Sequence, residues 1–457
     1  MKFYMCSYIF SHNFYFFQDN IMNAQNYPTP EKHKEHLGQY QINPNRAMFT
    51  IILSILVDVF GFSMVMPLLP FIVIDSLGAT PFMYGLIISS NAIAILIFGP
   101  IWGKLSDNYG RKPILIISQA GTGVAFLVLA FSYSIPVIFA GRIIDGIFSG
   151  QFPIVRAYIS DVTTPQTRSS QMSRIMVGYT GGMIIGPLIG GILGGINWAL
   201  PMLFAAFLTV VSIILTLTVL VESMPKERIN DLQIQKQMQK ANNDLDKKIW
   251  NKEVGIRFAQ IFLHSLISII FGASFSLVLY QRFNPDPSII GSIMSITGIV
   301  LMVYGLFLMR RIIRKIGEKK IFFASIIGYI ILFQFYPYLT ELWMVYVFMV
   351  PYALCMASVY PLISSNITKA VGPAKQGTIS GWTTNVQSIS QTISPLIATA
   401  YLQLGGVFLG FIYLNSYQLI GFTNIILAVI LFLVAYIDVE NHPNLYSWEK
   451  MLKKKKS

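Results

Sequence analysis

The chain has 457 residues, of which 54% are hydrophobic and 12% are charged. Soluble proteins carry about 25% charged residues, so this composition excludes an ordinary soluble domain and indicates membrane-spanning helices of about 20 apolar residues each. The net charge is +13, but the placement of the basic residues, described below, argues against a nucleic-acid site. Two cysteines are too few for a disulfide framework or a metal cluster.

The predicted elements are twelve apolar stretches, each long enough to cross a membrane as a helix. Gly and Pro within these stretches do not argue against helix, because membrane helices tolerate both. The spans are predicted at 47–75, 82–103, 113–133, 135–159, 171–195, 198–221, 254–280, 288–309, 321–339, 341–366, 377–403 and 415–437. The sequence therefore predicts an all-α membrane protein with twelve transmembrane helices.

A polar stretch rich in Lys, Gln, Asn and Asp separates the first six spans from the last six. The predicted parts are a cytoplasmic N-terminal tail at 1–46, a first half at 47–221, a cytoplasmic linker at 222–253, a second half at 254–437 and a basic cytoplasmic tail at 438–457. Residues 3–17 are aromatic but make a poor signal-peptide core, so they are assigned to the cytoplasmic tail. The alternative is that the protein starts at Met22.

The basic residues give the predicted orientation. With both termini in the cytoplasm, all but two of the 33 basic residues lie on the cytoplasmic side. The exceptions are Arg282 on the outer face and Arg142 within a span. The positive-inside rule favours this topology. The basic residues are therefore interpreted as setting the orientation in the membrane and not as a nucleic-acid site. A plasma membrane and an organelle membrane fit this topology equally.

The two halves share landmarks at a nearly constant offset, which predicts two pseudo-symmetric six-helix repeats with a substrate site between them near mid-membrane. The landmarks are Pro153 with Pro361 and Pro187 with Pro395, each 208 residues apart, and Gly110 with Gly317, 207 residues apart.

Several motifs resemble those of the major facilitator superfamily. GKLSDNYGRKP at 103–113 resembles its loop signature, and GRIIDG at 141–146 resembles its fourth-span arginine signature. LSILVDVFGFSMVMPLLP at 53–70, with ESMPKER at 222–228, resembles tetracycline-efflux proteins. The fifth span resembles the antiporter signature of the drug–proton antiporter branch, through Gly182, Gly186, Pro187, Gly190 and Gly191.

Asp58 is the first candidate for a proton or substrate site, because a carboxylate at a helix centre costs roughly 2.5–3.5 kcal/mol on insertion. Asp145 is expected at similar depth in the fourth span, and the Arg142 side chain is long enough to reach either carboxylate. Burial favours the neutral acid and a nearby arginine favours the carboxylate, so their balance suits reversible protonation. The alternative is a permanent ion pair that locks the first span to the fourth. In the resembled efflux proteins the first-span aspartate is functionally important, and Asp58 matches its position.

The second half departs from the resembled pattern. Tetracycline exporters carry further carboxylates within their spans, including one in the second half, but the predicted spans between 254 and 339 contain none. This absence argues against tetracycline itself as the substrate. His264 is the nearest titratable group, and it is either a coupling residue that titrates near neutrality or a hydrogen-bonded packing residue.

The loop motif is expected to fasten helix ends in one conformational state. Asp107 can accept hydrogen bonds from a nearby helix N-terminus and from Arg111, while Gly103 and Gly110 permit a tight turn and close approach. The resemblance implies that this clasp breaks during the inward-to-outward change; the alternative is a solvated charged loop. The second copy has Arg314 in place of Asp107, so only the first half should hold the clasp.

Two further spans carry patterned residues. Glycines recur every four residues from Gly178 to Gly194, which predicts close helix packing, with a bend at Pro187. In the eleventh span Thr384, Gln387, Gln391 and Ser394 form a polar stripe. These side chains, and Asn91 in the second span, either line a cavity or join helices by hydrogen bonds.

These observations predict a proton-coupled antiporter that exports a small organic solute as a monomer, without a cofactor or a metal. The alternatives are a facilitator or proton symporter for a metabolite, with Asp58 and Arg142 as substrate ligands, and a transport-dead receptor or scaffold. A membrane enzyme is not expected, because the sequence has no nucleotide-binding loop, metal-ligand spacing or nucleophile constellation.

Overall fold

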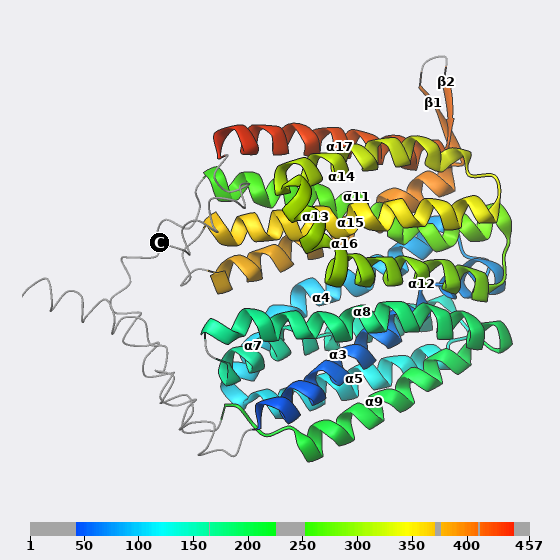
Figure 1. The fold of residues 1–457 in the computed structure, drawn as a ribbon. Coiled ribbons are helices and arrows are strands. Elements are labelled where there is room, and N and C mark those ends of the chain that lie inside the picture. The colour runs from blue at the N-terminus through cyan, green and yellow to red at the C-terminus, as the bar shows by residue number, and fades with distance from the viewer. Residues whose placement is uncertain (1–42, 164, 225–251, 371–375, 410–411, 443–457) are drawn as a thin grey trace, which may run out of the picture.

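The computed structural model describes residues 43–163, 165–224, 252–370, 376–409 and 412–442. Figure 1 shows long helices that cross the molecule side by side. The first half comprises α3 (Pro44–Val65), the π-helical turn η1 (Phe71–Ser76), α4 (Pro81–Tyr109), α5 (Arg111–Ala130), α6 (Ile135–Phe148), α7 (Gln151–Val162), α8 (Pro165–Ile196) and α9 (Ala199–Val219). The second half comprises α11 (Lys252–Phe283), α12 (Pro287–Val303), the π-helical η2 (Tyr304–Leu308), α13 (Met309–Ile316), α14 (Glu318–Phe335), the 3-10 turn η3 (Tyr336–Tyr338), α15 (Leu342–Ala370), α16 (Gln376–Leu404), β1 (Gly406–Leu409), β2 (Ile412–Asn415) and α17 (Ser416–Asn441).

Local sequence signals determine where several of these helices begin. α4 begins at Pro81, directly after Thr80, whose side chain accepts a hydrogen bond from the backbone N–H of Met83 at 3.2 Å. α17 begins with a capping box in which Asn415 and Gln418 each accept the other's backbone N–H. Such caps supply partners for the first N–H groups of a helix, which have none within it.

Within the described ranges, eleven helical segments are long and apolar enough to cross a membrane, with α6–α7 and α12–α13 each counted as one. The remaining long helix is α16, which has 29 residues but carries many Thr, Ser and Gln side chains. It packs against α4, α11 and α17, so protein rather than lipid covers much of it. With α16 the twelve predicted spans are all present as helices, and the fold is the expected twelve-helix bundle.

Four details differ from the predicted spans. The first span, expected over 47–75, is divided into α3, which ends at Val65, and η1, which begins at Phe71. The fourth span, expected as one helix over 135–159, is broken at Ser149 and Gly150 into α6 and α7. α17 continues to Asn441, so residues 438–441, expected in the C-terminal tail, belong to the last helix. A short antiparallel hairpin, β1–β2, pairs Gly406 with Asn415 before α17 and was not predicted. Most of the expected linker and both tails lie outside the described residues.

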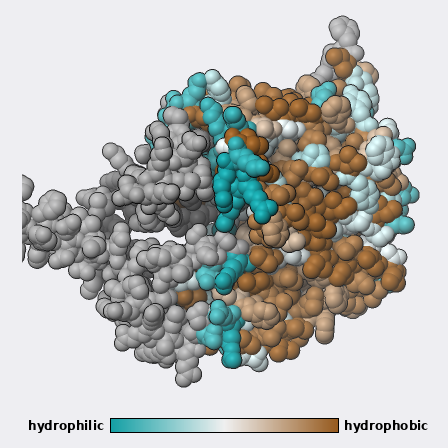
Figure 2. Space-filling view, viewed as in Figure 1, coloured by the Kyte–Doolittle hydropathy of each residue, from teal (hydrophilic) through white to brown (hydrophobic). Residues whose placement is uncertain are grey.

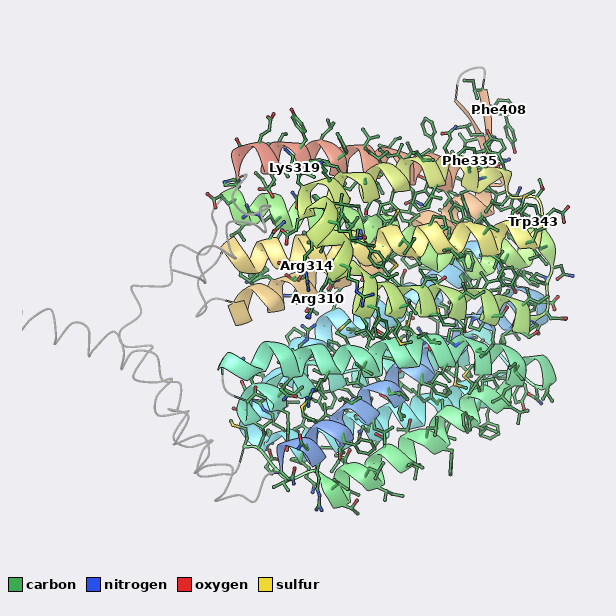
Figure 3. All side chains as sticks on the ribbon, viewed as in Figure 1. Arg310, Arg314, Lys319, Phe335, Trp343 and Phe408 are labelled. Atoms are coloured by element: carbon green, nitrogen blue, oxygen red, sulfur yellow. The ribbon has the colours of Figure 1, made fainter. Side chains whose placement is uncertain are left out.

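The two ends of the bundle differ in polarity. Figure 2 shows hydrophobic side chains over a broad band across the middle of the molecule. Hydrophilic ones lie at both edges of this band, and the most hydrophilic follow its left edge. Figure 3 places Arg310, Arg314 and Lys319 toward that edge, whereas Trp343 and Phe408 lie toward the other end. We call these the basic end and the opposite end. An exposed apolar band of this kind needs a lipid environment.

The structure bears out the internal repeat. Gly110 and Gly317, which match in the sequence, both connect two helices with a left-handed backbone, at φ +97° and φ +92°. Pro187 and Pro395 both lie inside matching long helices, α8 and α16. The halves meet through two equivalent pairs, α4 with α16 and α8 with α12.

Contacts between the halves extend from the opposite end toward the middle. At that end the Phe82 N–H donates to Gln403 Oε1 at 3.1 Å, and the rings of Phe71 and Tyr280 lie 4.9 Å apart. Ser89 Oγ, further along α4, donates to the backbone carbonyl of Thr392 at 2.8 Å.

Candidate functional site

Asp58 is held by a residue from the broken fourth span. It lies half-buried on α3, and its Oδ1 accepts a hydrogen bond from Gln151 Nε2 at 2.9 Å. Gln151 is the first residue of α7 and is buried, because the break at Gly150 turns its side chain toward α3. Ser54 Oγ donates to Gln151 Oε1 at 3.1 Å, which directs the amide nitrogen to the carboxylate.

The hydrogen bonds continue beyond Gln151 into the first half. Gln119 Nε2 on α5 donates to Ser54 Oγ at 2.8 Å and to Ser212 Oγ on α9 at 3.0 Å. All three of these side chains are buried. Sequence reasoning missed Gln151 and Gln119, although glutamine inside an apolar span is itself the signal that could have found them.

Arg142, Asp145 and Asn91 form a second buried group beside Asp58. Arg142 Nη1 lies 3.2 Å from Asp145 Oδ2, and Asn91 Nδ2 donates to the same oxygen at 2.9 Å and to the Arg142 carbonyl at 3.0 Å. Asn91 therefore joins α4 to α6 by hydrogen bonds, which was one of its two interpretations. Its buried amide supports the charge pair.

The two carboxylates are neighbours, but Arg142 pairs with only one of them. Asp58 and Asp145 are close enough to interact electrostatically. Within the described ranges no ion pair joins Arg142 to Asp58, and Arg142 Nε and Nη2 are buried without a hydrogen-bond partner. These two nitrogens give the arginine spare donor capacity to bind a second anionic oxygen when the site rearranges.

His264 lies in the second half, within an aromatic group. It is buried on α11, and its ring centroid lies 6.0 Å from that of Tyr329 and 6.1 Å from that of Tyr360. Its Nδ1 has no hydrogen-bond partner in the described part of the chain. The structure thus places it in aromatic packing, away from the Asp58 and Asp145 carboxylates.

One residue of the polar stripe of α16 contacts an arginine that sequence analysis assigned to the cytoplasmic side. Thr384 Oγ1 accepts a hydrogen bond from Arg156 Nη1 at 3.3 Å, across the interface between the halves. Gln387 is half-buried, Gln391 is exposed and Ser394 is buried. Arg156 is half-buried on α7, and its bond to Thr384 joins this helix to the second half.

The loop motif forms a clasp at the basic end of the first half. Arg111 Nη1 lies 2.7 Å from Asp107 Oδ1, and Arg111 Nε lies 3.0 Å from Asp161 Oδ2 on α7. Glu222, after α9, accepts the backbone N–H groups of Arg111 and Lys112 at 2.8 and 2.9 Å. The clasp therefore ties α4, α5, α7 and the segment after α9 together.

Two expectations about this motif need correction or extension. Gly103 was expected at the turn, but it lies inside α4, and a methyl group added there would have no neighbour within 4 Å, so the turn depends on Gly110 alone. Asp107 contacts Arg111, as expected, and Glu222 is an additional acceptor for the backbone N–H groups at the start of α5. Asp161 and Glu222 were missed as partners because both are distant from the motif in sequence.

The glycine motif of α8 contacts both halves. A methyl group at Gly186 would lie 2.8 Å from the Phe60 carbonyl oxygen on α3, and one at Gly190 would lie 2.5 Å from that of Met64. One at Gly191 would lie 2.6 Å from the Pro287 carbonyl oxygen on α12. Gly182 also packs on α3, and the carbonyl of Pro187 lies against Gly291 of α12. The motif thus brings backbones together on two sides of one helix.

A second buried ion pair was not predicted. Arg257 on α11 and Asp438 on α17 are both fully buried and form two hydrogen bonds, at 3.0 Å from Nη2 and 3.2 Å from Nε. Gln260 Nε2 also donates to Asp438, at 3.2 Å. Sequence reasoning placed Arg257 at the cytoplasmic end of the seventh span and Asp438 at the start of the C-terminal tail, where charge alone gives no sign of burial.

Comparisons with known proteins agree with this architecture. The family model of the Major Facilitator Superfamily matches residues 51–395 and residues 257–456. The class H tetracycline resistance protein of Pasteurella multocida is 27% identical over 362 residues, which are 77% of this chain and 88% of that protein. Multidrug resistance protein 2 of Bacillus subtilis (strain 168) is 27% identical over 61% of this chain and 70% of its own length. The crystal structure of the human organic anion transporter MFSD10 (TETRAN) superposes with a TM-score of 0.64 at 20% identity, over 86% of this chain and 100% of that chain.

Proposed function

This chain belongs to the Major Facilitator Superfamily, and from that premise we propose that it is a proton-coupled antiporter that exports a small organic compound. The matched relatives are named for resistance to tetracycline or to several drugs, which supports a drug-like substrate class. The observation that carries the proposal is the half-buried Asp58 carboxylate, which a single amide donor from Gln151 holds within the first half.

Asp58 is the proposed proton carrier. As a carboxylate it accepts the Gln151 hydrogen bond and interacts electrostatically with Asp145. Protonation removes a negative charge from this pair and turns one acceptor oxygen into an O–H donor, so it changes both the local hydrogen bonding and the attraction for Arg142. Because a ligand shifts a conformational equilibrium only through its different affinities for the two states, this local change is the step that links the proton to transport.

The conformational change is proposed as a movement of the two halves about the α4–α16 and α8–α12 contacts. The contacts near Phe82 and Phe71 separate when the opposite end opens. We take the basic end as cytoplasmic by the positive-inside rule, with both termini on that side, and the chain as acting alone. The Arg111 clasp keeps the basic end of the first half together while the halves move.

The experiment uses purified protein in liposomes that contain a pH-sensitive dye. A panel of cationic, anionic and amphipathic compounds is added to wild type, to Asp58→Asn and to Asp286→Asn. The exposed Asp286 carboxylate lies at the start of α12 and serves as the matched control. Proton movement that depends on a compound, persists in Asp286→Asn and is lost in Asp58→Asn supports the proposal.

Two results contradict it. Proton movement that survives in Asp58→Asn assigns coupling to another group, with Asp145 and His264 as the next to replace. Compound flux without any proton signal excludes antiport and supports a facilitator instead.

A further inference from the structure

Arg156 is a cation at the interface between the halves that lacks a carboxylate partner among the described residues. Its Nη1 donates to Thr384 Oγ1 at 3.3 Å, and its guanidinium carbon lies 4.6 Å from the centre of the Phe152 ring. Within the described part of the chain it forms no ion pair. By contrast, the buried Arg111, Arg142 and Arg257 each contact at least one aspartate.

Aromatic side chains from both halves lie near this cation. Phe152 on α7 packs edge-to-face with Tyr179 on α8, at 6.2 Å between ring centroids. Tyr360 on α15 is close enough to interact electrostatically with both Arg156 and Tyr179, and it stacks on His264. Arg156, Phe152 and Tyr360 are half-buried and Tyr179 is exposed, so part of each side chain remains accessible to a ligand.

The chemistry of this group selects one class of ligand. A half-buried guanidinium without a counter-charge is costly in a membrane protein, and an anionic oxygen offsets that cost with charge-assisted hydrogen bonds. Aromatic faces around the cation bind flat rings by stacking. Cationic compounds are repelled by Arg156, and a purely aliphatic anion leaves the rings unused.

We propose that Arg156 binds the anionic group of an aromatic organic substrate, which Phe152, Tyr179 and Tyr360 hold by ring contacts. This inference rests on the proposed transport function, whose substrate class it narrows. Gln151 and Arg156 lie on one helix, about 7.5 Å apart along its axis. The anion site is thus adjacent to the Asp58 proton site but separate from it.

The test measures equilibrium binding of two fluorescent dyes to the detergent-solubilised full chain by fluorescence polarisation. Fluorescein is an aromatic anion, and a cationic rhodamine has the same ring system with the opposite charge. Arg156→Gln should weaken fluorescein binding by about tenfold or more, since a hydrogen-bonded charge pair is lost, while rhodamine binding is retained or improved. Arg156→Lys, which keeps the charge without the planar fork, should give an intermediate affinity for fluorescein.

Arg174→Gln is the matched control, because Arg174 is exposed on α8, and it should leave both affinities unchanged. Wild type that binds fluorescein no better than Arg156→Gln overturns the inference. An equal loss of both dyes in Arg156→Gln and Arg156→Lys also overturns it, because it indicates a structural role. Dye binding needs no proton gradient, so this result is independent of whether Asp58 couples transport to protons.

Discussion

Gln151 Nε2 donates a hydrogen bond to Asp58 Oδ1 at 2.9 Å, which connects the start of α7 to the middle of α3. The bond exists because the fourth span breaks at Gly150. A methyl group at Gly150 would collide with the Trp102 ring, so the break itself depends on a residue without a side chain. One structural irregularity thus places both the Asp58 partner and, just over one turn later, Arg156.

Replacing Gln151 with Leu removes the donor that stabilises the Asp58 carboxylate. Asp58 should then keep its proton to higher pH, because a hydrogen bond to the charged form favours that form. The pH at half-maximal transport should rise by about 0.5–1 unit, as expected for one hydrogen bond of about 1 kcal/mol. The measurement is transport against external pH in proteoliposomes. Gln281→Leu, at an exposed position of α11, is the control, and an unshifted profile in Gln151→Leu contradicts the assignment.

Replacing Arg111 with Lys tests the clasp. Lysine keeps the charge but lacks the planar fork that contacts Asp107, Asp161 and Ser106 together. Transport should fall by about tenfold, corresponding to about 1.4 kcal/mol for one or two lost charge-assisted hydrogen bonds. The control is Lys104→Arg, on the exposed face of α4. Wild-type transport by Arg111→Lys would show that charge alone is sufficient.

Replacing Gly191 with Ala tests the packing of the two halves. The added methyl group would lie 2.6 Å from the Pro287 carbonyl oxygen, so α8 and α12 must move apart near the opposite end. The conformation that is closed at that end should become less populated, and transport should decrease. The readout is the labelling rate of a single cysteine placed in the interface, alongside transport. Gly195→Ala is the control, because nothing lies within 4 Å of its added methyl; equal behaviour of the two variants refutes the prediction.

The buried Arg257–Asp438 pair should be a large determinant of stability. Arg257→Met leaves Asp438 buried without its main partner, and the cost should be about 3–5 kcal/mol. Replacing both residues, as Arg257→Met with Asp438→Leu, should recover most of that loss because no buried charge remains. Thermal unfolding in detergent measures both, with exposed Arg310→Met as the control. A double variant no more stable than Arg257→Met would contradict the charge argument.

The sequence by itself determined the number of spans, the two-half organisation and the position of the carboxylate in the first span. Long apolar stretches leave a chain no alternative to helices in lipid, because every backbone polar group must be satisfied within the segment. The offset between Gly110 and Gly317 indicated the repeat, and both glycines adopt the same left-handed turn. Asp58 was found because a carboxylate inside an apolar stretch is conspicuous in any sequence.

Only the tertiary structure decided which side chains meet. The Gln151 bond to Asp58, the burial of Arg257 against Asp438 and the orientation of Arg156 toward Thr384 all join residues that are distant along the chain. A charged residue near a helix end has the same local sequence whether it faces water or a neighbouring helix. Its partner depends on where a helix breaks and how the neighbours pack, which hydrophobic periodicity does not encode.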